Sequence, residues 1–175
     1  MAGFTTGATQ LSEYDHNGHV MSATLSTTDL RLRPMVPADL NAISRIEKHA
    51  YTAPWGKGVF KDCLNVGHCC QVLEHQGQVV AYGIISVGAG EAHLLNLCVA
   101  PDWQGRGLAR RLLGHLLALA AVYGAQSLFL EVRPSNTVAR QLYQSSGLCE
   151  VGIRHRYYPA PNGREDALIM AIELS

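Results

Sequence analysis

The chain has no excess of charge of either sign. The 14 Lys and Arg residues are balanced by 14 Asp and Glu residues, which gives a formal net charge of 0 at pH 7. A broad electrostatic attraction to nucleic acid or to an anionic membrane surface is therefore not expected. Charged residues make up only 16% of the 175 residues and hydrophobic residues 47%. This composition is typical of one globular domain with a substantial core.

Paired cysteines and metal-ligand spacings are also missing. The cysteines, 5 in all, contain no Cys-x-x-Cys pair, and the 8 histidines are scattered along the chain. Such a pattern predicts neither a disulfide framework nor a zinc site. We therefore expect no bound metal, and we interpret the cysteines as reduced thiols of a cytoplasmic protein, several of them buried as small hydrophobic side chains.

No apolar run approaches the roughly 20 residues that a membrane-spanning helix needs. The richest apolar segment is interrupted by His115 and by arginines. The amino terminus has no basic region followed by an apolar block, so no secretion signal is expected. Residues 1–28 are rich in Thr, Ser, Gly and His and show little periodicity. We interpret them as a flexible N-terminal extension ahead of a single domain at residues 29–175.

The periodicity of residues 29–175 predicts a mixed α/β domain whose central sheet has about seven strands and is flanked by about four helices. The expected strands lie at residues 30–36, 69–74, 78–87, 91–99, 127–133, 149–157 and 167–174, with a turn at 159–163 before the last of them. The expected helices lie at residues 37–51, 58–65, 108–123 and 136–146. One face of the longest helix carries Leu108, Leu112, Leu116, Leu119 and Tyr123. Around residues 107–132, strand, helix and strand form a parallel crossover unit.

A glycine-rich, basic turn separates the strand ending at Val99 from the longest helix. It reads Gln104-Gly105-Arg106-Gly107-Leu108-Ala109-Arg110. Such a turn exposes backbone N–H groups at the positive end of a helix dipole, which favours a phosphate. The spacing is neither Gly-x-x-x-x-Gly-Lys-Ser/Thr nor Gly-x-Gly-x-x-Gly, which argues against a nucleotide hydrolase and a dinucleotide-binding fold. The alternative is a turn that merely begins the helix.

Glu131 is the first candidate for chemistry. It follows Leu128 and Leu130 in an expected parallel strand whose alternation places Glu131 on the face opposite to these leucines. A carboxylate near the carboxyl end of such a strand stands where ligands enter open α/β sheets. The alternative is an ion pair with Arg133 or Arg140 at the end of the strand.

Two further candidates follow in the next expected helix. Asn136 is placed to cap that helix, so a structural role is one interpretation. Tyr143 lies about two helical turns later, so both side chains project from nearly the same face. The alternative for Tyr143 is a core position.

The turn matches Gln/Arg-x-x-Gly-x-Gly/Ala, and the chain therefore resembles the GCN5-related N-acetyltransferases (GNAT family), whose order of strands and helices it also shares. Within that family, the last third resembles the RimI-type ribosomal-protein alanine N-acetyltransferases. The matching stretches are residues 129–136, 139–143, 146–148, 156–159 and 162–170. The resemblance covers about residues 30–174 and omits the first 28 or so.

The resemblance implies a GNAT fold and acetyl transfer from acetyl-CoA to the α-amine of an N-terminal alanine on a small-subunit ribosomal protein. It implies that Glu131 is the base and Tyr143 the acid. The positions that it assigns to acetyl-CoA are Leu97, Cys98, Val99, Gln104, Gly105, Arg106, Gly107, Leu108, Ala109, Arg110 and Asn136. Members of the family often carry a basic residue in place of Gly105, and Ala109 replaces the last glycine of the motif.

These roles are chemically coherent. A free amine attacks a thioester only when neutral, and the reference pKa of an α-amine is about 7.7–8.0, compared with about 10.4 for lysine. Glu131 accepts the proton directly or through a water, and does so better if burial raises its pKa. Tyr143, with a reference pKa of about 10, returns a proton to the sulfur. Backbone amides along residues 97–99 bind the pantetheine arm and polarise the thioester carbonyl.

The peptide side of the site is expected at Trp55, in the loop between the first helices, and at Tyr157 and Tyr158 in the last hairpin. Trp55 has an equal alternative as an anchor between helices. Glu165 and Asp166 either attract a basic peptide or are solvated hairpin charges. His93 is expected to be an ordinary strand residue rather than part of a proton relay, and Cys98 a packed side chain rather than a covalent nucleophile.

Two rival functions stay open at this point. One is a GNAT enzyme that acetylates lysine or a small amine. The other is a non-catalytic sensor that binds acyl-CoA, although such a protein has no use for the paired base and acid of Glu131 and Tyr143. We expect a monomer or a weak oligomer.

Overall fold

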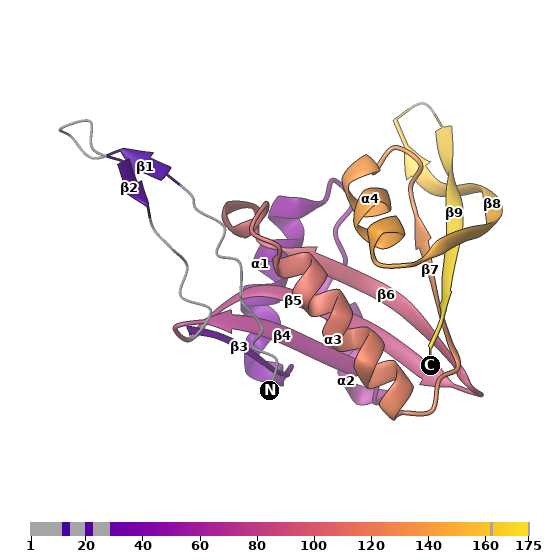
Figure 1. Cartoon of the computed structure of the whole chain (residues 1–175), viewed down its shortest axis with the longest axis horizontal. Helices are drawn as coiled ribbons and strands as arrows, with labels where there is room; N and C mark the ends of the chain where they lie inside the picture. Colours follow the sequence, from indigo (N-terminus) through magenta and orange to yellow (C-terminus); the bar gives the residue numbers. More distant parts are fainter. Residues whose placement is uncertain (1–11, 15–19, 23–28, 162, 175) are drawn as a thin grey trace, which may run out of the picture.

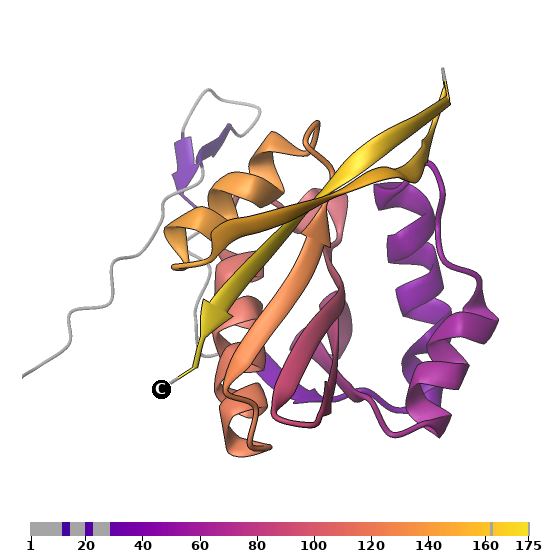
Figure 2. The ribbon, with the colours of Figure 1, turned by 90° about the vertical axis from the view of Figure 1, so that its right-hand side faces the viewer.

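The computed structural model of the chain describes residues 12–14, 20–22, 29–161 and 163–174, and its sheet lies between two layers of helices (Figures 1 and 2). Helices α1 (Leu40–Ala50) and α2 (Lys57–Asn65) cover one face, and α3 (Leu108–Val122) and α4 (Thr137–Ser145) cover the other. The sheet has 7 strands in the order β3-β4-β5-β6-β7-β9-β8. These strands are β3 (Leu30–Pro34), β4 (Cys69–His75), β5 (Gln78–Gly88), β6 (Glu91–Val99), β7 (Ser127–Val132), β8 (Cys149–Ala160) and β9 (Gly163–Glu173). The predicted mixed α/β fold is confirmed.

One parallel pair positions the functional residues. β6 and β7 are parallel and are connected through α3, which confirms the predicted crossover. Their register runs from Glu91 opposite Ser127 to Leu94 opposite Leu130, and there the pairing ends. On its other side β6 carries a register shift against β5, between Ile84 and Ile85. The carboxyl ends of β6 and β7 therefore separate, which leaves room between two strands of the sheet.

A glycine on β5 sets how closely α3 packs on the sheet. A Cβ atom at Gly83 would lie 2.6 Å from Leu116 Cδ1 and 3.5 Å from Leu112 Cδ2, both on α3. The first contact is closer than van der Waals packing permits, so a larger residue here would require the end of the Leu116 side chain to move.

The predicted apolar face of α3 is correct at Leu108, Leu112 and Leu116, which are buried. It is wrong at Tyr123, which caps the carboxyl end of the helix and is 61% exposed. The helix ends there, so helical periodicity no longer directs the side chain to the sheet. Leu113 and Ala120, which the predicted face did not include, are also buried.

The last hairpin is longer than predicted. Pro159 and Ala160, expected in a turn, continue β8 and pair with Arg164 and Gly163 of β9. Proline lacks an N–H donor, but β8 is the edge of the sheet, where proline is tolerated. The two tyrosines lie at the end of a register shift of β8 between Arg154 and Tyr158, where Arg156 has a φ angle of 55°.

Part of the N-terminal extension has secondary structure. β1 (Ser12–Tyr14) and β2 (Val20–Ser22) form an antiparallel pair in which Ser12 is opposite Ser22. The other residues of 1–28 lie outside the described part of the chain. The division between an extension at 1–28 and a domain at 29–175 stays a prediction. Among the residues that are described, no helix is long and apolar enough to cross a membrane.

Candidate active site

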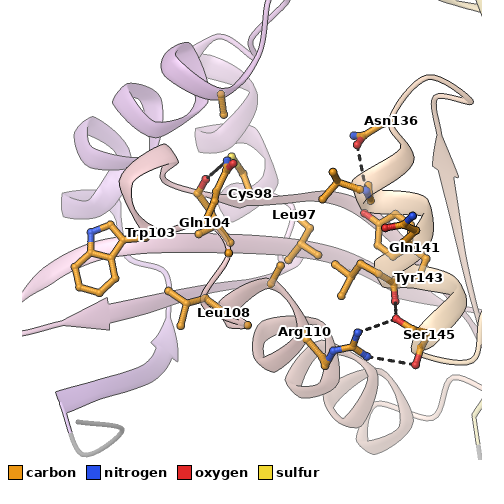
Figure 3. A pocket seen from close by; sticks show the side chains of 18 of the residues that line it. Leu97, Cys98, Trp103, Gln104, Leu108, Arg110, Asn136, Gln141, Tyr143 and Ser145 are labelled. Atoms are coloured by element: carbon orange, nitrogen blue, oxygen red, sulfur yellow. Dashed lines mark hydrogen bonds between the residues drawn. The ribbon is translucent and has the colours of Figure 1, made fainter. Parts of the chain in front are cut away.

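A cleft of about 790 Å³ lies between the end of β6, the start of α3 and α4, and we call it the larger cleft (Figure 3). Of the positions matched to acetyl-CoA, the following line it: Leu97, Cys98, Val99, Gln104, Gly105, Gly107, Leu108, Ala109, Arg110 and Asn136. Arg106 is not part of this lining. Its guanidinium lies 4.9 Å from the ring centre of Trp103 and donates to the carbonyl oxygen of Asp102 at 3.0 Å.

The glycines of the turn hold a backbone that other residues rarely adopt. Gly105 and Gly107 have φ angles of 73° and 77°, in the left-handed region. Gly107 is the N-cap of α3 and provides no side-chain hydrogen bond to the first turn. The N–H groups at the start of α3 therefore stay available at the positive end of its dipole, which is the geometry of a phosphate site. The conformation also gives a reason for glycine at position 105, where a basic residue is common in the family.

Hydrogen bonds order the walls of the larger cleft (Figure 3). Arg110 of α3 donates to Ser145 Oγ at 2.7 Å and to the Ser145 carbonyl at 3.3 Å, which joins α3 to the end of α4. Gln104 donates from Nε2 to the carbonyl oxygen of Val99 at 3.1 Å, which fixes the turn against β6. The turn and both helices thus form one connected frame.

A second cleft of about 400 Å³ occupies the opening between β6 and β7, and we call it the smaller cleft. Glu131, Trp55 and Tyr158 are among its lining residues, but Tyr157 is not. The two clefts have five lining residues in common: Tyr51, Leu97, Asn136, Ala139 and Tyr143. The predicted base and acid therefore border the same opening, and the predicted acid lies where the two clefts meet.

Glu131 is partly exposed and paired with a residue that the sequence did not indicate. Its side chain is 31% exposed, and Oε1 lies 3.1 Å from Nε of Arg154. The partners considered in the alternative are engaged elsewhere, because Arg133 pairs with Glu165 and Arg140 with Glu150. That alternative is wrong about the partner. Arg154 reaches Glu131 across β9, a neighbourhood that only the pairing of distant strands creates.

Tyr143 and Asn136 lie on one side of α4, as their spacing predicts. Tyr143 is 8% exposed and belongs to the core on the α3 side of the sheet, and it also lines both clefts. Burial raises the pKa of its hydroxyl, so the proton stays bound at neutral pH. Asn136 Oδ1 accepts a hydrogen bond from the Ala139 N–H at 3.2 Å, which confirms the predicted helix cap.

The profile of the acetyltransferase (GNAT) family matches residues 40–148, which is more than half of the chain. The chain belongs to the GNAT family. It is 42% identical over 137 residues to the [ribosomal protein bS18]-alanine N-acetyltransferase of Escherichia coli K12, and this match covers 78% of this chain and 93% of that protein. It is 38% identical to the protein of that name from Haemophilus ducreyi, with 82% and 99% of the two chains covered.

Solved structures agree with this membership. The crystal structure of the ribosomal-protein-S18-alanine N-acetyltransferase from Escherichia coli has a TM-score of 0.79, 39% identity, and 83% and 94% of the two chains covered. A structure of yncA from Salmonella typhimurium with its cofactor acetyl-CoA has a TM-score of 0.72 and 20% identity over 83% of this chain and 94% of that one, which shows a common fold. The predicted family and GNAT fold are confirmed.

In this GNAT domain the buried Cys98 packs inward, as the sequence favoured. It is 5% exposed, and burial, together with the nearby carboxylate of Glu47, raises the pKa of its thiol to about 12. A thiol that keeps its proton is a poor nucleophile. His93 stacks on Phe129 with ring centres 5.6 Å apart and lines neither cleft. This position agrees with an ordinary strand histidine.

The remaining candidates of the last hairpin are held by internal contacts. Glu165 accepts from the Ser135 N–H at 2.8 Å and from Arg133 at 3.1 Å, and these bonds lower the pKa of its carboxyl. Asp166 accepts from the Arg156 N–H at 2.7 Å, which lowers its pKa in the same way. Both carboxylates thus act in organising the hairpin. Among the described residues, no three His, Cys, Asp or Glu side chains gather into a metal site.

Tyr51 is a residue of the site that the sequence did not indicate. It lines both clefts, and its hydroxyl donates to the Leu97 carbonyl at 3.2 Å. Burial raises the pKa of this hydroxyl, so it stays a donor. The sequence offers one weak signal, an aromatic residue at the end of a predicted helix. The contact with Leu97 joins segments 46 positions apart, which periodicity does not predict.

Proposed function

We propose that this GNAT enzyme acetylates the α-amine of an N-terminal alanine on a small-subunit ribosomal protein. The meeting of the two clefts at Tyr143 carries the proposal, because it allows a donor and an acceptor to reach one point. The proteins named as bS18-alanine N-acetyltransferases support it, since they match this chain over nearly their whole length. A ribosomal substrate also fits the expected cytoplasmic location.

The donor is acetyl-CoA, the cosubstrate of the family, and the larger cleft fits it. No side chain caps the N–H groups at the start of α3, and the space beside Gly105 and Gly107 is open, because a Cβ built on either residue would meet no atom within 4 Å outside its chain neighbours. These N–H groups would hold the diphosphate. The backbone of residues 97–99, beyond the end of the β6–β7 pairing, would hold the pantetheine arm. Asn136 contacts the donor from α4.

Glu131 and Tyr143 supply two proton transfers of the reaction. Glu131 takes one proton from the protonated α-amine, directly or through a water, and the neutral amine then attacks the thioester carbon, losing a second proton to solvent as the new N–C bond forms. Tyr143 gives its proton to the sulfur as the C–S bond breaks, and its buried hydroxyl holds that proton until the transfer. Trp55 and Tyr158 form walls for the peptide in the smaller cleft. We include Tyr157 as an outer peptide contact, since it packs edge-on against Tyr158 with ring centres 4.9 Å apart.

The acceptor is tested with two peptides of the same basic sequence. One begins with a free alanine, and its twin has a blocked N-terminus and contains a lysine. We expect turnover of the free peptide and little of its twin, because an α-amine at neutral pH loses its proton far more readily than a lysine. Release of free thiol from acetyl-CoA measures the rate. Equal or faster turnover of the blocked peptide favours a lysine acetyltransferase, and binding of acetyl-CoA without turnover of either favours the sensor.

The donor site is tested at the turn. In Gly107→Ala, holding the left-handed backbone of the turn costs about 1–2 kcal/mol more than in the wild type. Binding of the diphosphate needs this backbone, so we expect the KM for acetyl-CoA to rise by about tenfold. Gly114→Ala is the matched control, because Gly114 lies within α3 with no atom within 4 Å of an added Cβ. The control is expected to keep the wild-type KM. Similar KM values in both variants contradict the assigned diphosphate position.

A further inference from the structure

Glu47 is a buried carboxylate that the proposed reaction does not use. It lies on α1, is 1% exposed, and borders the smaller cleft. A carboxylate so far from water is tolerated only when its oxygens accept hydrogen bonds. The partners of Glu47 therefore show what it does in this fold.

The two carboxylate oxygens of Glu47 accept hydrogen bonds from two different parts of the fold. Oε1 accepts a hydrogen bond from the Trp55 N–H at 2.8 Å, and Oε2 accepts one from the Tyr82 hydroxyl of β5. The carbonyl oxygen of Glu47 accepts from the Tyr51 N–H at 3.0 Å. The backbone bond is the last one of α1, and the side chain adds the bond that holds Trp55 at the far end of residues 51–55.

Besides Glu47, the Tyr51 hydroxyl holds the start of the segment through its hydrogen bond to the Leu97 carbonyl. Thr52, Ala53 and Pro54 are exposed. Its packing comes from Trp55, whose ring centre lies 5.5 Å from that of Phe60. Yet Tyr51, Ala53 and Trp55 all line the smaller cleft. The shape of this cleft therefore depends on a segment that hydrogen bonds to Glu47 hold in place.

We propose that Glu47 is a positioning residue for the acceptor peptide, which it serves by anchoring residues 51–55 as a wall of the smaller cleft. The proposal rests on the proposed function, in which that cleft binds the peptide. Hydrogen-bond acceptance carries this role, and the negative charge does not. A glutamine at position 47 can accept from the Trp55 N–H with its oxygen and donate to the Tyr82 hydroxyl with its nitrogen.

The test compares Glu47→Leu with Glu47→Gln. Leucine leaves the Trp55 N–H without its partner, so we expect the peptide KM to rise by about tenfold, with the acetyl-CoA KM unchanged. Glutamine is expected to keep both KM values and kcat close to wild type. Hydrogen exchange of the Trp55 amide should accelerate in the leucine variant and stay slow in the glutamine variant.

Tyr82→Phe is the matched control, because it removes the other partner of the carboxylate and leaves the Trp55 bond in place. We expect a lower melting temperature, because Oε2 loses its buried hydrogen bond, but slow exchange of the Trp55 amide and a nearly wild-type peptide KM. If the leucine variant does not fold, Glu47→Met replaces it with a flexible side chain of similar volume. The same rise of the peptide KM is expected.

Three results would overturn the inference. A Glu47→Gln enzyme as slow as Glu131→Gln identifies Glu47 as a base. A leucine variant whose peptide KM is unchanged, or whose KM values for peptide and acetyl-CoA rise alike, shows that Glu47 has no specific effect on peptide binding. If hydrogen exchange of the Trp55 amide is unchanged in the leucine variant, Glu47 does not anchor the segment. If the wild-type enzyme turns over no peptide, the proposed function fails, while the amide exchange still decides whether Glu47 holds the segment.

Discussion

Replacing Glu131 with glutamine is expected to lower kcat by about 10²–10⁴-fold, the usual contribution of a general base. The amide has the size of the carboxylate but accepts no proton from the attacking amine. The larger cleft does not include Glu131, so the affinity for acetyl-CoA should stay at the wild-type value. Release of thiol measures the rate, and calorimetric titration of acetyl-CoA measures the affinity.

This loss is expected to shrink as the pH rises. An α-amine has a reference pKa of about 7.7–8.0, so above that range most of the peptide is already neutral and needs no base. Glu165→Gln is the control, since it also breaks an ion pair near β7, the one with Arg133, without removing a residue of the smaller cleft. A Glu131→Gln enzyme at the wild-type rate, or an equal loss in both variants, contradicts the assignment.

The second large effect is expected from Tyr143→Phe, which should lower kcat by about 10²-fold or more because no proton is delivered to the departing sulfur. Phenylalanine fills the same place in the core, so the melting temperature should change little. Burial raises the pKa of Tyr143, and the residue therefore keeps its proton through the whole range of an activity assay. The alkaline side of the pH–rate profile should thus keep its midpoint in the variant.

Tyr123→Phe is the matched control, because Tyr123 is exposed at the end of α3 and lines neither cleft. It should behave as the wild type in kcat and in both KM values. A Tyr143→Phe enzyme with normal kcat and a raised KM for acetyl-CoA would make Tyr143 a binding residue, and the acid would have to be sought elsewhere.

The sequence predicted the parts of the site that depend on local periodicity and on a short motif. The turn at residues 104–110, the crossover from β6 to β7 and the Asn136 cap arise within neighbouring elements, so spacing was sufficient for them. The alternation of β7 also holds in the structure, where Leu128 and Leu130 are buried and Glu131 is partly exposed.

The sequence did not predict the contacts that distant segments make. Arg154 reaches Glu131 from two strands away, and Tyr51, at the end of α1, reaches Leu97 of β6. Glu47 lies within the helix predicted at residues 37–51, and helical spacing gives no sign that Trp55 and Tyr82 donate hydrogen bonds to it. Each of these contacts follows from tertiary packing, on which helix and strand periodicities carry no information.

The separation of β6 from β7 beyond Leu94 and Leu130 bears on the kinetic order of the reaction. One compartment lies against α3 and α4, and the other is bordered by residues 47–55 and the last hairpin, so each reactant has an approach of its own. Both can be present before any bond changes, and neither must leave to admit the other. A ternary complex with transfer in a single chemical event is the outcome that this architecture favours, with no acylated form of the protein along the way.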